Sequence, residues 1–379
     1  MPVPKKYTVC LVAPTHWSAK MGGAPYQVKC LTDTLASKPD YDVSVLTRRA
    51  NPDYQGDGYR VISIASKAIF HSARYIVDMP KLLITLRRLK PSFIYQRVGC
   101  AYTGAVAFYS KIYGVNSVWH IASDKDVQPY QRSEKKKNII ERIEKKILEY
   151  GIRNITHIIA QTNAQSEFLE KNYQRKASAV IPNFHPLPEE KIEKGEVIKV
   201  IWIANFKRLK QPEIFIQLAK DLAHLKNAEF ILIGAPSNDQ GWQATLEESI
   251  NALDNLKYVG EKPQAEVNQI IATSHILVNT SLWEGFSNTF VQAWMRRVPI
   301  VSLQVNPDNI FDDRKVGLIS HDVTQLSKDV KQLVEDTGLR EKMGSAAQGF
   351  AIDRHSLKNV ESIVDLLKME PGSSKQVLN

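Results

Sequence analysis

The sequence predicts an α/β fold made of two domains, each with a parallel sheet between helices. The chain has 379 residues, and one hydrophobic core rarely grows beyond about 250–300 residues. Short β-branched runs alternate with segments of helical periodicity in both halves, which is the pattern of parallel sheets flanked by helices. A segment rich in proline and charge, residues 185–196, separates the two series.

We expect the first domain over residues 1–184, a linker over 185–196 and the second domain over 197–355. β-branched runs in the first domain predict strands at residues 7–13, 43–46, 93–96, 117–121, 157–161 and 179–181. In the second domain they predict strands at residues 198–204, 229–233, 256–259, 276–279, 299–303 and 317–320. Pro25 and Pro212 suit the first position of the helix after the opening strand of each domain.

Composition limits the classes of protein that the chain can represent. Hydrophobic residues make up 43% and charged residues 24%, as in ordinary soluble proteins, and no apolar run approaches the ~20 residues of a membrane span. Cys10, Cys30 and Cys100 lack metal-ligand spacing, and the N-terminus lacks the pattern of a secretion signal. We therefore expect a cytoplasmic protein with buried thiols. The net charge of +10 permits anionic partners, but no nucleic-acid-binding signature accompanies it.

The most informative segment is SLWEGFSNTFVQA at residues 281–293. A strand is expected to end just before it, a turn carries Glu284 and Gly285, and a helix starts near Ser287 or Asn288. Backbone N–H groups at a helix N-terminus bind anions, so a diphosphate could lie here. Glu284 would lie beside that site and could accept hydrogen bonds from sugar hydroxyls.

This segment resembles the E-x7-E motif of the family-4 retaining glycosyltransferases of GT-B fold, the glycosyltransferase group 1. In that family the first Glu meets the donor sugar and the second binds the nucleotide ribose. Glu284 matches the first, but Gln292 stands in place of the second. Gln keeps hydrogen-bonding capacity but loses the charge. Thr289 and Gln292 also have capping-box spacing, so ribose contact and helix capping remain alternatives. The resemblance also assigns donor contacts to Gly285, Phe286, Ser287 and Asn288.

A basic loop follows the first strand of the second domain, and it resembles the loop in which the family neutralises the donor diphosphate with an Arg and a Lys. Lys207 takes the Arg position and Lys210 matches the Lys, with Arg208 as the partner if the alignment shifts by one residue. Fixed cations at that place stabilise the charge that develops on the leaving diphosphate. The alternative is that these are solvated surface cations.

Two segments of the first domain resemble other parts of the family pattern. Gly22 and Gly23 match its glycine loop, where backbone approaches the donor phosphates; a flexible turn is the alternative. His120, at the end of an expected strand, matches a histidine that contacts the donor sugar across the cleft; a core histidine is the alternative. Asp124 and Asp126 form a D-x-D pattern, which we interpret as part of a loop or as an acceptor contact, because the resemblance implies no metal or other cofactor.

The resemblance spans nearly the whole chain and implies two Rossmann-like domains that face each other across a cleft. It implies that a last helix, at about residues 356–379, packs back on the first domain. It also places Lys262 beside the nucleotide base pocket. The expected helix at residues 135–150 has an apolar stripe beside a basic face, so it suits either an anionic membrane surface or packing on the first domain.

The expected function is transfer of a sugar, with retention, from a UDP- or GDP-sugar to a hydroxyl of a carbohydrate or lipid-linked acceptor, in polysaccharide or glycolipid assembly. We expect a cytoplasmic enzyme, with a peripheral position at the inner face of the membrane as an open possibility. Two other functions remain. One is a nucleotide-sugar-binding protein with weak or no transfer, because of Gln292. The other is an epimerase or phosphorylase of the same fold. We expect no nucleic acid as a partner.

Overall fold

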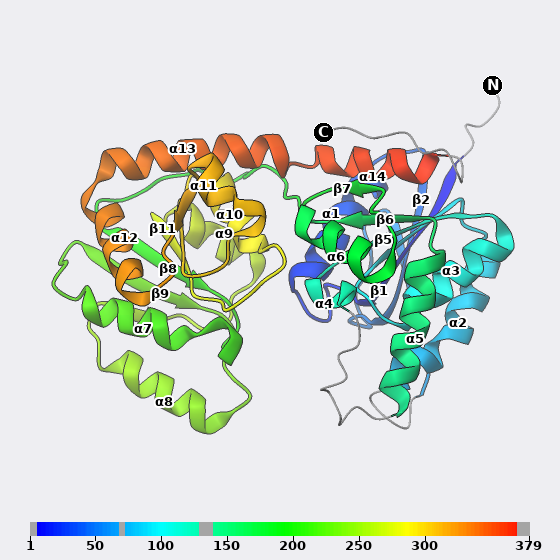
Figure 1. Ribbon diagram of the computed structural model, residues 1–379, viewed down its shortest axis with the longest axis horizontal. Helices are drawn as coiled ribbons and strands as arrows, with labels where there is room; N and C mark the ends of the chain where they lie inside the picture. The colour runs from blue at the N-terminus through cyan, green and yellow to red at the C-terminus, as the bar shows by residue number, and fades with distance from the viewer. Residues whose placement is uncertain (1–5, 68–72, 129–138, 370–379) are drawn as a thin grey trace. The chain divides into compact units, whose positions relative to one another are not determined.

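The computed structural model describes residues 6–67, 73–128 and 139–369, and the chain divides into two compact units (Figure 1). The first unit contains the chain up to Phe184 together with the part from Leu357 onward, and the second unit contains His185–Ser356. Each unit has its own parallel sheet and its own buried residues on both faces of that sheet. The predicted α/β class is confirmed.

The sheet of the first unit has seven parallel strands in the order β3-β2-β1-β4-β5-β6-β7. Their bounds are β1 (Tyr7–Thr15), β2 (Tyr41–Arg49), β3 (Tyr59–Ser63), β4 (Phe93–Arg97), β5 (Asn116–His120), β6 (His157–Ala160) and β7 (Ala179–Val180). The direction in which strands are added reverses between β1 and β4, and ligands of such sheets bind beyond the carboxyl ends of the strands at this point.

Helices cover both faces of this sheet. They are α1 (Gly23–Ala36), α2 (Arg74–Leu89), α3 (Ala101–Tyr113), α4 (Asp124–Val127), α5 (Ile139–Asn154), α6 (Asn163–Tyr173) and α14 (Lys358–Lys368). Alternate residues of β1 point to opposite faces: Val9 and Leu11 pack with α1 and α14, whereas Cys10 and Val12 pack with α2 and α3. Figure 1 shows α2, α3 and α5 side by side.

The sheet of the second unit has six parallel strands in the order β10-β9-β8-β11-β12-β13. Their bounds are β8 (Ile198–Ile203), β9 (Ala228–Ile233), β10 (Leu256–Tyr258), β11 (Ile276–Asn279), β12 (Ile300–Ser302) and β13 (Gly317–Ile319). The helices are α7 (Pro212–Asp221), α8 (Gln240–Asn251), α9 (Gln264–Ala272), α10 (Asn288–Met295), α11 (Ile310–Arg314), α12 (Val323–Glu335) and α13 (Thr337–Arg354), with short 3₁₀ turns at Arg208–Lys210 and Pro307–Asn309.

The segment 185–196, expected to be a linker, contacts the second unit. Glu190 forms an ion pair with the buried Arg296, and Lys194 Nζ donates to the carbonyl oxygen of Arg297 at 2.9 Å. The backbone N–H of His185 donates to the carbonyl oxygen of His355 at 2.8 Å. Two charged side chains of the segment, Glu190 and Lys194, therefore have partners elsewhere in the unit, which composition alone did not reveal.

The last described helix, α14, packs in the first unit. Val360, Ile363 and Val364 lie in the same apolar cluster as β1 and α1, and Asn116 Nδ2 donates to the carbonyl oxygen of Leu367 at 3.2 Å. Within the described part of the chain, no helix combines the length and apolar character that crossing a membrane requires.

Candidate functional site

Glu284 lies in the turn that follows β11, and its side chain is 15% exposed. Three side chains bond its carboxylate: Lys210 Nζ at 2.9 Å, Ser281 Oγ at 2.7 Å and Asn279 Nδ2 at 2.9 Å. Burial opposes ionisation, but the charge of Lys210 and these hydrogen bonds outweigh it and hold the pKa of Glu284 below its usual value. Glu284 is therefore a charged carboxylate in a fixed orientation.

The loop that carries Lys210 is joined to the turn of Glu284 by a second set of contacts. The hydroxyl of Thr280 lies 2.6 Å from the carbonyl oxygen of Lys210 and accepts a hydrogen bond from Trp202 Nε1 at 2.8 Å. The backbone N–H of Leu282 donates to the carbonyl oxygen of Leu209 at 2.9 Å. The loops after β8 and β11 thus meet at the carboxyl edge of the second sheet, where parallel α/β sheets bind ligands.

The other two basic residues of this loop lie in different surroundings. Arg208 is exposed; its guanidinium pairs with Asp239 at 3.4 Å and lies 4.7 Å from the ring centre of Trp242. The Lys207 side chain is also exposed, and it makes no hydrogen bond or ion pair with another described residue. Lys207 is therefore the more available of the two cations for a ligand.

Helix α10 begins directly after the turn of Glu284. Ser287 is its N-cap residue, but its side chain makes no capping hydrogen bond and instead lies 2.8 Å from Thr289 Oγ1. The first turn of α10 contains no acidic side chain. The partial positive charge of the helix N-terminus is therefore not neutralised there and can attract an anion. Phe286 packs inward, with its ring 4.8 Å from that of His355, so only its backbone is placed for a ligand.

Gln292 lies in the second turn of α10 and is 3% exposed. Because Ser287 is the N-cap, the third helical position, which a capping box requires, is Phe290. The capping alternative for Gln292 is therefore wrong. The Gln292 side chain forms no hydrogen bond with another described residue, while its backbone carbonyl accepts from Arg296 Nη1 at 3.0 Å.

Comparison with known families gives this site its context. Residues 185–350 match the family described as "Glycosyl transferases group 1". The second unit is a group 1 glycosyltransferase domain. The match runs from the first residues of the unit to helix α13, so it includes both loops of the candidate site.

Curated relatives match the chain at low identity. The "Glycosyltransferase 1 domain-containing protein 1" of Xenopus tropicalis is 23% identical over 43% of this chain and 47% of its own length. The poly(ribitol-phosphate) alpha-N-acetylglucosaminyltransferase of Staphylococcus aureus is 24% identical over 65% of this chain and 48% of its own length. The chain thus spans about half the length of the curated relatives that it matches.

Solved structures match nearly the whole chain. Sucrose-phosphate synthase from Thermosynechococcus elongatus has a TM-score of 0.73 at 14% identity, covering 95% of this chain and 98% of that one. Anabaena HepE, solved with UDP and glucose, has a TM-score of 0.72 at 16% identity, covering 95% and 99%. These matches show the fold, so the predicted GT-B architecture is confirmed. The group 1 domain is one of its two halves.

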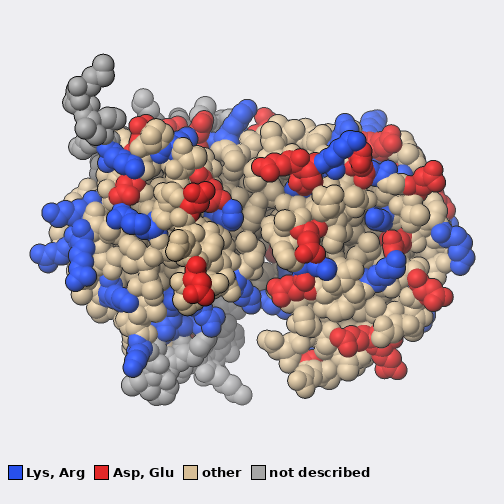
Figure 2. All heavy atoms as spheres, turned by 180° about the vertical axis from the view of Figure 1, so that it is seen from behind, with Lys and Arg blue, Asp and Glu red and all other residues tan. Residues whose placement is uncertain are grey.

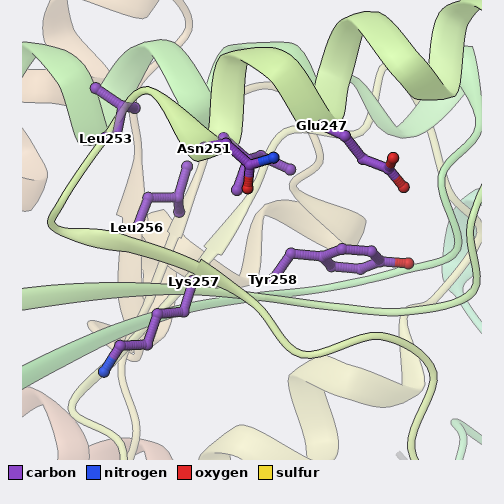
Figure 3. Close-up of a pocket in the computed structure, with 7 residues that line it drawn as sticks. Glu247, Asn251, Leu253, Leu256, Lys257 and Tyr258 are labelled. Carbon is purple, nitrogen blue, oxygen red and sulfur yellow. The ribbon is translucent and has the colours of Figure 1, made fainter.

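Lys262, predicted to lie beside the base pocket, is in the segment between β10 and α9 of the group 1 domain. Its ammonium lies 3.4 Å from Glu266, and its side chain is 35% exposed. A hollow of the same domain lies between α8 and β10, with a volume of about 440 Å³ (Figure 3). Glu247, Asn251 and Tyr258 line it, and none of the predicted site residues does, so it is separate from the candidate site.

In the first unit, His120 ends β5 and is 0% exposed. Burial, and next the positive charge of Arg97, hold its pKa well below the usual value. Its Nδ1 lies 2.9 Å from the hydroxyl of Tyr95. Gly22 and Gly23 stand where α1 begins, with Gly22 as an extended N-cap residue that lacks a side-chain cap. A Cβ on Gly22 would meet only Pro25, at 3.9 Å.

The D-x-D pattern serves local structure. Asp126 completes a capping box with Ser123 at the start of α4, and Asp124 Oδ1 accepts from Gln165 Nε2 at 2.8 Å. Across residues 6–67, 73–128 and 139–369, no three His, Cys, Asp or Glu side chains gather in a way that could hold a metal ion.

Sequence reasoning did not identify Asn279, Thr280 and Ser281 as site residues. The signal was present as a run of three polar residues that begins at the last position of a buried strand, at the edge where parallel sheets bind ligands. Their roles depend on which atoms they reach, and the chain order alone does not show this.

Proposed function

We propose that the chain transfers a sugar, with retention, from a UDP- or GDP-sugar to a hydroxyl acceptor. The contact between Lys210 and Glu284, beside the N-terminus of α10, carries this proposal. At this place a cation and a helix N-terminus, which suit a diphosphate, lie beside a charged carboxylate, which can accept hydrogen bonds from sugar hydroxyls. The group 1 match of the same unit supports a nucleotide sugar as the donor.

In the proposed mechanism the second unit binds the donor. Lys207, Lys210 and the backbone N–H groups of α10 stabilise the diphosphate as it leaves with increased negative charge. Glu284 accepts hydrogen bonds from hydroxyls of the sugar and thereby fixes its orientation. The acceptor hydroxyl attacks the anomeric carbon on the face that the diphosphate leaves, and a diphosphate oxygen takes its proton. Gly285, Ser287 and Asn288 would supply further donor contacts, and Gln292 would reach the ribose.

Other solved proteins of this fold support UDP as the nucleotide. HepE was solved with UDP and glucose, and Staphylococcus aureus TarM was solved with UDP; its TM-score is 0.60 at 18% identity, over 77% of this chain and 59% of that one. GDP remains the alternative, because base recognition is assigned only to the segment around Lys262.

The acceptor that we propose is a carbohydrate or lipid-linked glycan, as in polysaccharide or glycolipid assembly. The curated Staphylococcus relative acts on poly(ribitol-phosphate), a polymer.

We place the enzyme in the cytoplasm, at the inner face of the membrane. Helix α5 supports this, because Ile139 and Ile143 are 74% and 46% exposed on a helix that also carries Arg and Lys side chains, whereas Leu148 and Ile152 are buried. Residues 135–138 of the predicted helix lie outside the described residues. Figure 2 shows Lys and Arg side chains on both units.

A second candidate function is sugar-nucleotide binding with little transfer, favoured by Gln292 in place of an acidic residue. An epimerase or phosphorylase of the same fold is the third. Product analysis without an acceptor separates the epimerase, and dependence on phosphate separates the phosphorylase. Binding of UDP or GDP without turnover over an acceptor panel would favour the binding protein.

The deciding experiment measures transfer from a panel of UDP- and GDP-sugars in wild type and in Glu284→Gln and Lys210→Met. We expect each variant to lose about 10²–10³-fold in kcat, as when one preorganised electrostatic contact is removed. Glu229→Gln is the matched control, since Glu229 also pairs with a lysine of this unit, Lys257, away from the proposed site. Near-wild-type rates in both site variants would contradict the proposal.

A further inference from the structure

A group of buried polar side chains lies at the carboxyl edge of the first sheet, and His120 is the predicted site residue among them. Tyr95 and Arg97 belong to β4, and Asn183 follows β7. Arg97 and His120 are register partners at the ends of neighbouring strands. Tyr95, Arg97 and His120 are each at most 1% exposed. Their hydrogen bonds therefore decide which protonation states they adopt.

These side chains form one chain of hydrogen bonds. Arg97 Nη2 donates to Asn183 Oδ1 at 2.7 Å, and Arg97 Nη1 donates to the hydroxyl oxygen of Tyr95 at 3.2 Å. The same hydroxyl lies 2.9 Å from His120 Nδ1. The chain therefore runs from a permanent cation, through one hydroxyl, to the imidazole.

The direction of the chain follows from what each group can donate. A guanidinium only donates, so the Tyr95 oxygen accepts from Arg97. The Tyr95 hydroxyl has one proton to donate. Among the described residues, the atom that can accept this proton in a hydrogen bond is His120 Nδ1. Nδ1 is therefore unprotonated, and a neutral His120 carries its proton on Nε2.

The electrostatic surroundings keep this ring neutral. Burial is the main cause that lowers the pKa of His120, the charge of Arg97 is the second, and a backbone carbonyl at Ile181 acts in the opposite sense. His120 Nε2 is buried and has no hydrogen-bond partner within the described part of the chain. The ring thus carries a buried N–H donor that makes no standard hydrogen bond to a described residue and has the backbone carbonyl at Ile181 nearby.

The backbone beside Arg97 is held in a strained conformation. Val98 has φ of 77°, which is a genuine outlier for a β-branched residue. Gln96 Nε2 fixes it by donating to the carbonyl oxygens of Arg97 at 3.0 Å and of Val98 at 2.6 Å. Strain of this kind persists where the surrounding structure fixes a functional geometry.

We propose that Tyr95 and Arg97 are positioning residues that fix His120 as an Nε2–H donor toward an oxygen of the bound substrate. This inference rests on the proposed transfer function and on the contact between His120 and the donor sugar that the family resemblance predicts. Because the donor is neutral and directed, it recognises a hydroxyl or ether oxygen and adds no charge to the site.

Nitrogen NMR of protein with labelled histidines tests the tautomer directly. The chain has nine histidines, and His120→Gln identifies the signal of His120. In wild type we expect Nε2 protonated and Nδ1 unprotonated. Because this measurement needs no positioning variant, a variant that fails to fold cannot leave the question open. A proton on Nδ1 in wild type would overturn the proposal.

Variants then test what fixes the tautomer. Tyr95→Phe removes the proton donor to Nδ1, and Arg97→Met frees the Tyr95 oxygen to accept from Nδ1–H, so both should give a mixture of tautomers. Arg97→Lys keeps a donor-only cation and should retain the wild-type signal. Tyr109→Phe is the matched control, because its buried hydroxyl donates to the carbonyl oxygen of Leu86 in the same unit. An unchanged His120 signal in both Tyr95→Phe and Arg97→Met would refute the positioning role.

Kinetics separates this inference from the proposed function. With a donor found in the panel, Tyr95→Phe should lower kcat about tenfold while the donor KM stays within about twofold. Tyr109→Phe should leave both constants unchanged. A tautomer change without loss of kcat would overturn the link to the substrate. If wild type turns over no nucleotide sugar, the proposed function fails, and the NMR experiment still decides whether Tyr95 and Arg97 set the tautomer.

Discussion

The ionised state of Glu284 depends on partners from two loops, and this makes the stability of the second unit depend on pH. Its pKa is lower in the folded chain than the ordinary value of 4.5. A carboxyl of this kind stabilises the fold above its unfolded pKa, and the contribution disappears as pH falls through the folded pKa. We therefore expect the difference in free energy of unfolding between wild type and Glu284→Gln to shrink from pH ~7 to pH ~3. Urea unfolding at several pH values measures it, and a difference independent of pH would be evidence against the lowered pKa.

Gln292 gives a second prediction at this scale. The residue is 3% exposed in α10, and its side chain makes no hydrogen bond to a described residue, so its amide is available to a ligand. Gln292→Glu should lower the Kd of UDP about 3- to 10-fold, since hydrogen bonds to a charged acceptor are roughly twice as strong. Titration calorimetry measures the affinity, with the exposed Gln217→Glu of α7 as control. Weaker UDP binding in Gln292→Glu, with the fold intact, would argue against a ribose contact.

Single residues differ in how far the sequence could predict them. Glu284 and Lys210 were recognised because their segments resemble the E-x7-E motif and the basic loop of the family, and the structure brings the two side chains into contact. Ser281 and Asn279 were missed, since a hydrogen-bond partner is chosen by tertiary position. For His120 the sequence predicted a strand end and left a core histidine as the alternative to a sugar contact; the structure shows that the side chain is fully buried by the strands and helices packed around it. The roles of all these residues in transfer stay predictions.

Helices α3 and α5 approach so closely that their backbones touch. A Cβ at Gly151 would lie 2.6 Å from the backbone nitrogen of Gly104, and one at Gly104 would lie 2.5 Å from the carbonyl oxygen of Ile147. Backbone atoms cannot move aside cheaply, so Gly151→Ala should reduce the free energy of unfolding by about 1–3 kcal/mol, the usual cost of overpacking. Chemical denaturation of the first unit's transition measures this.

The control uses a helical glycine with free space around it. A Cβ at Gly349 in α13 would meet no atom within 4 Å, so Gly349→Ala should stabilise the second unit by about 0.5–1 kcal/mol through helix propensity. Opposite signs for the two substitutions are expected. Equal effects would show that helix propensity, and not the contact between α3 and α5, governs Gly151.

Most elements could be predicted because hydrophobic periodicity and burial coincide in parallel sheets. Every expected strand overlaps an observed one. Strand β3 was missed, since Tyr59–Ser63 is a partly exposed strand at the edge of the sheet with less apolar character. Residues 185–196 read as a linker because charge pairs such as Glu190 with Arg296 form between segments far apart in sequence.

At the scale of the whole molecule, the chain leaves the first unit, forms the second and returns to complete the first. The second unit is continuous in sequence, from His185 to Ser356, whereas the first unit includes α14. Val360, Ile363 and Val364 of α14 belong to the core cluster of the first sheet. The two units should therefore differ in whether they can fold from one uninterrupted piece of chain.

We expect residues 185–356 to fold alone, because they contain a complete sheet and both of its apolar clusters. They should bind UDP with a Kd within a few fold of that of the full chain, because the donor contacts of the proposed mechanism lie in this unit. They should catalyse no transfer, because the predicted site residues of the first unit, Gly22, Gly23 and His120, are absent. Circular dichroism tests folding and calorimetry tests binding, with Lys210→Met in the same fragment as the binding control. Residues 1–184 should be unfolded or aggregated, because losing α14 exposes the apolar face that Val360 and Ile363 cover. A fragment 185–356 that folds but does not bind UDP, while the full chain does, would show that the first unit supplies much of the donor site.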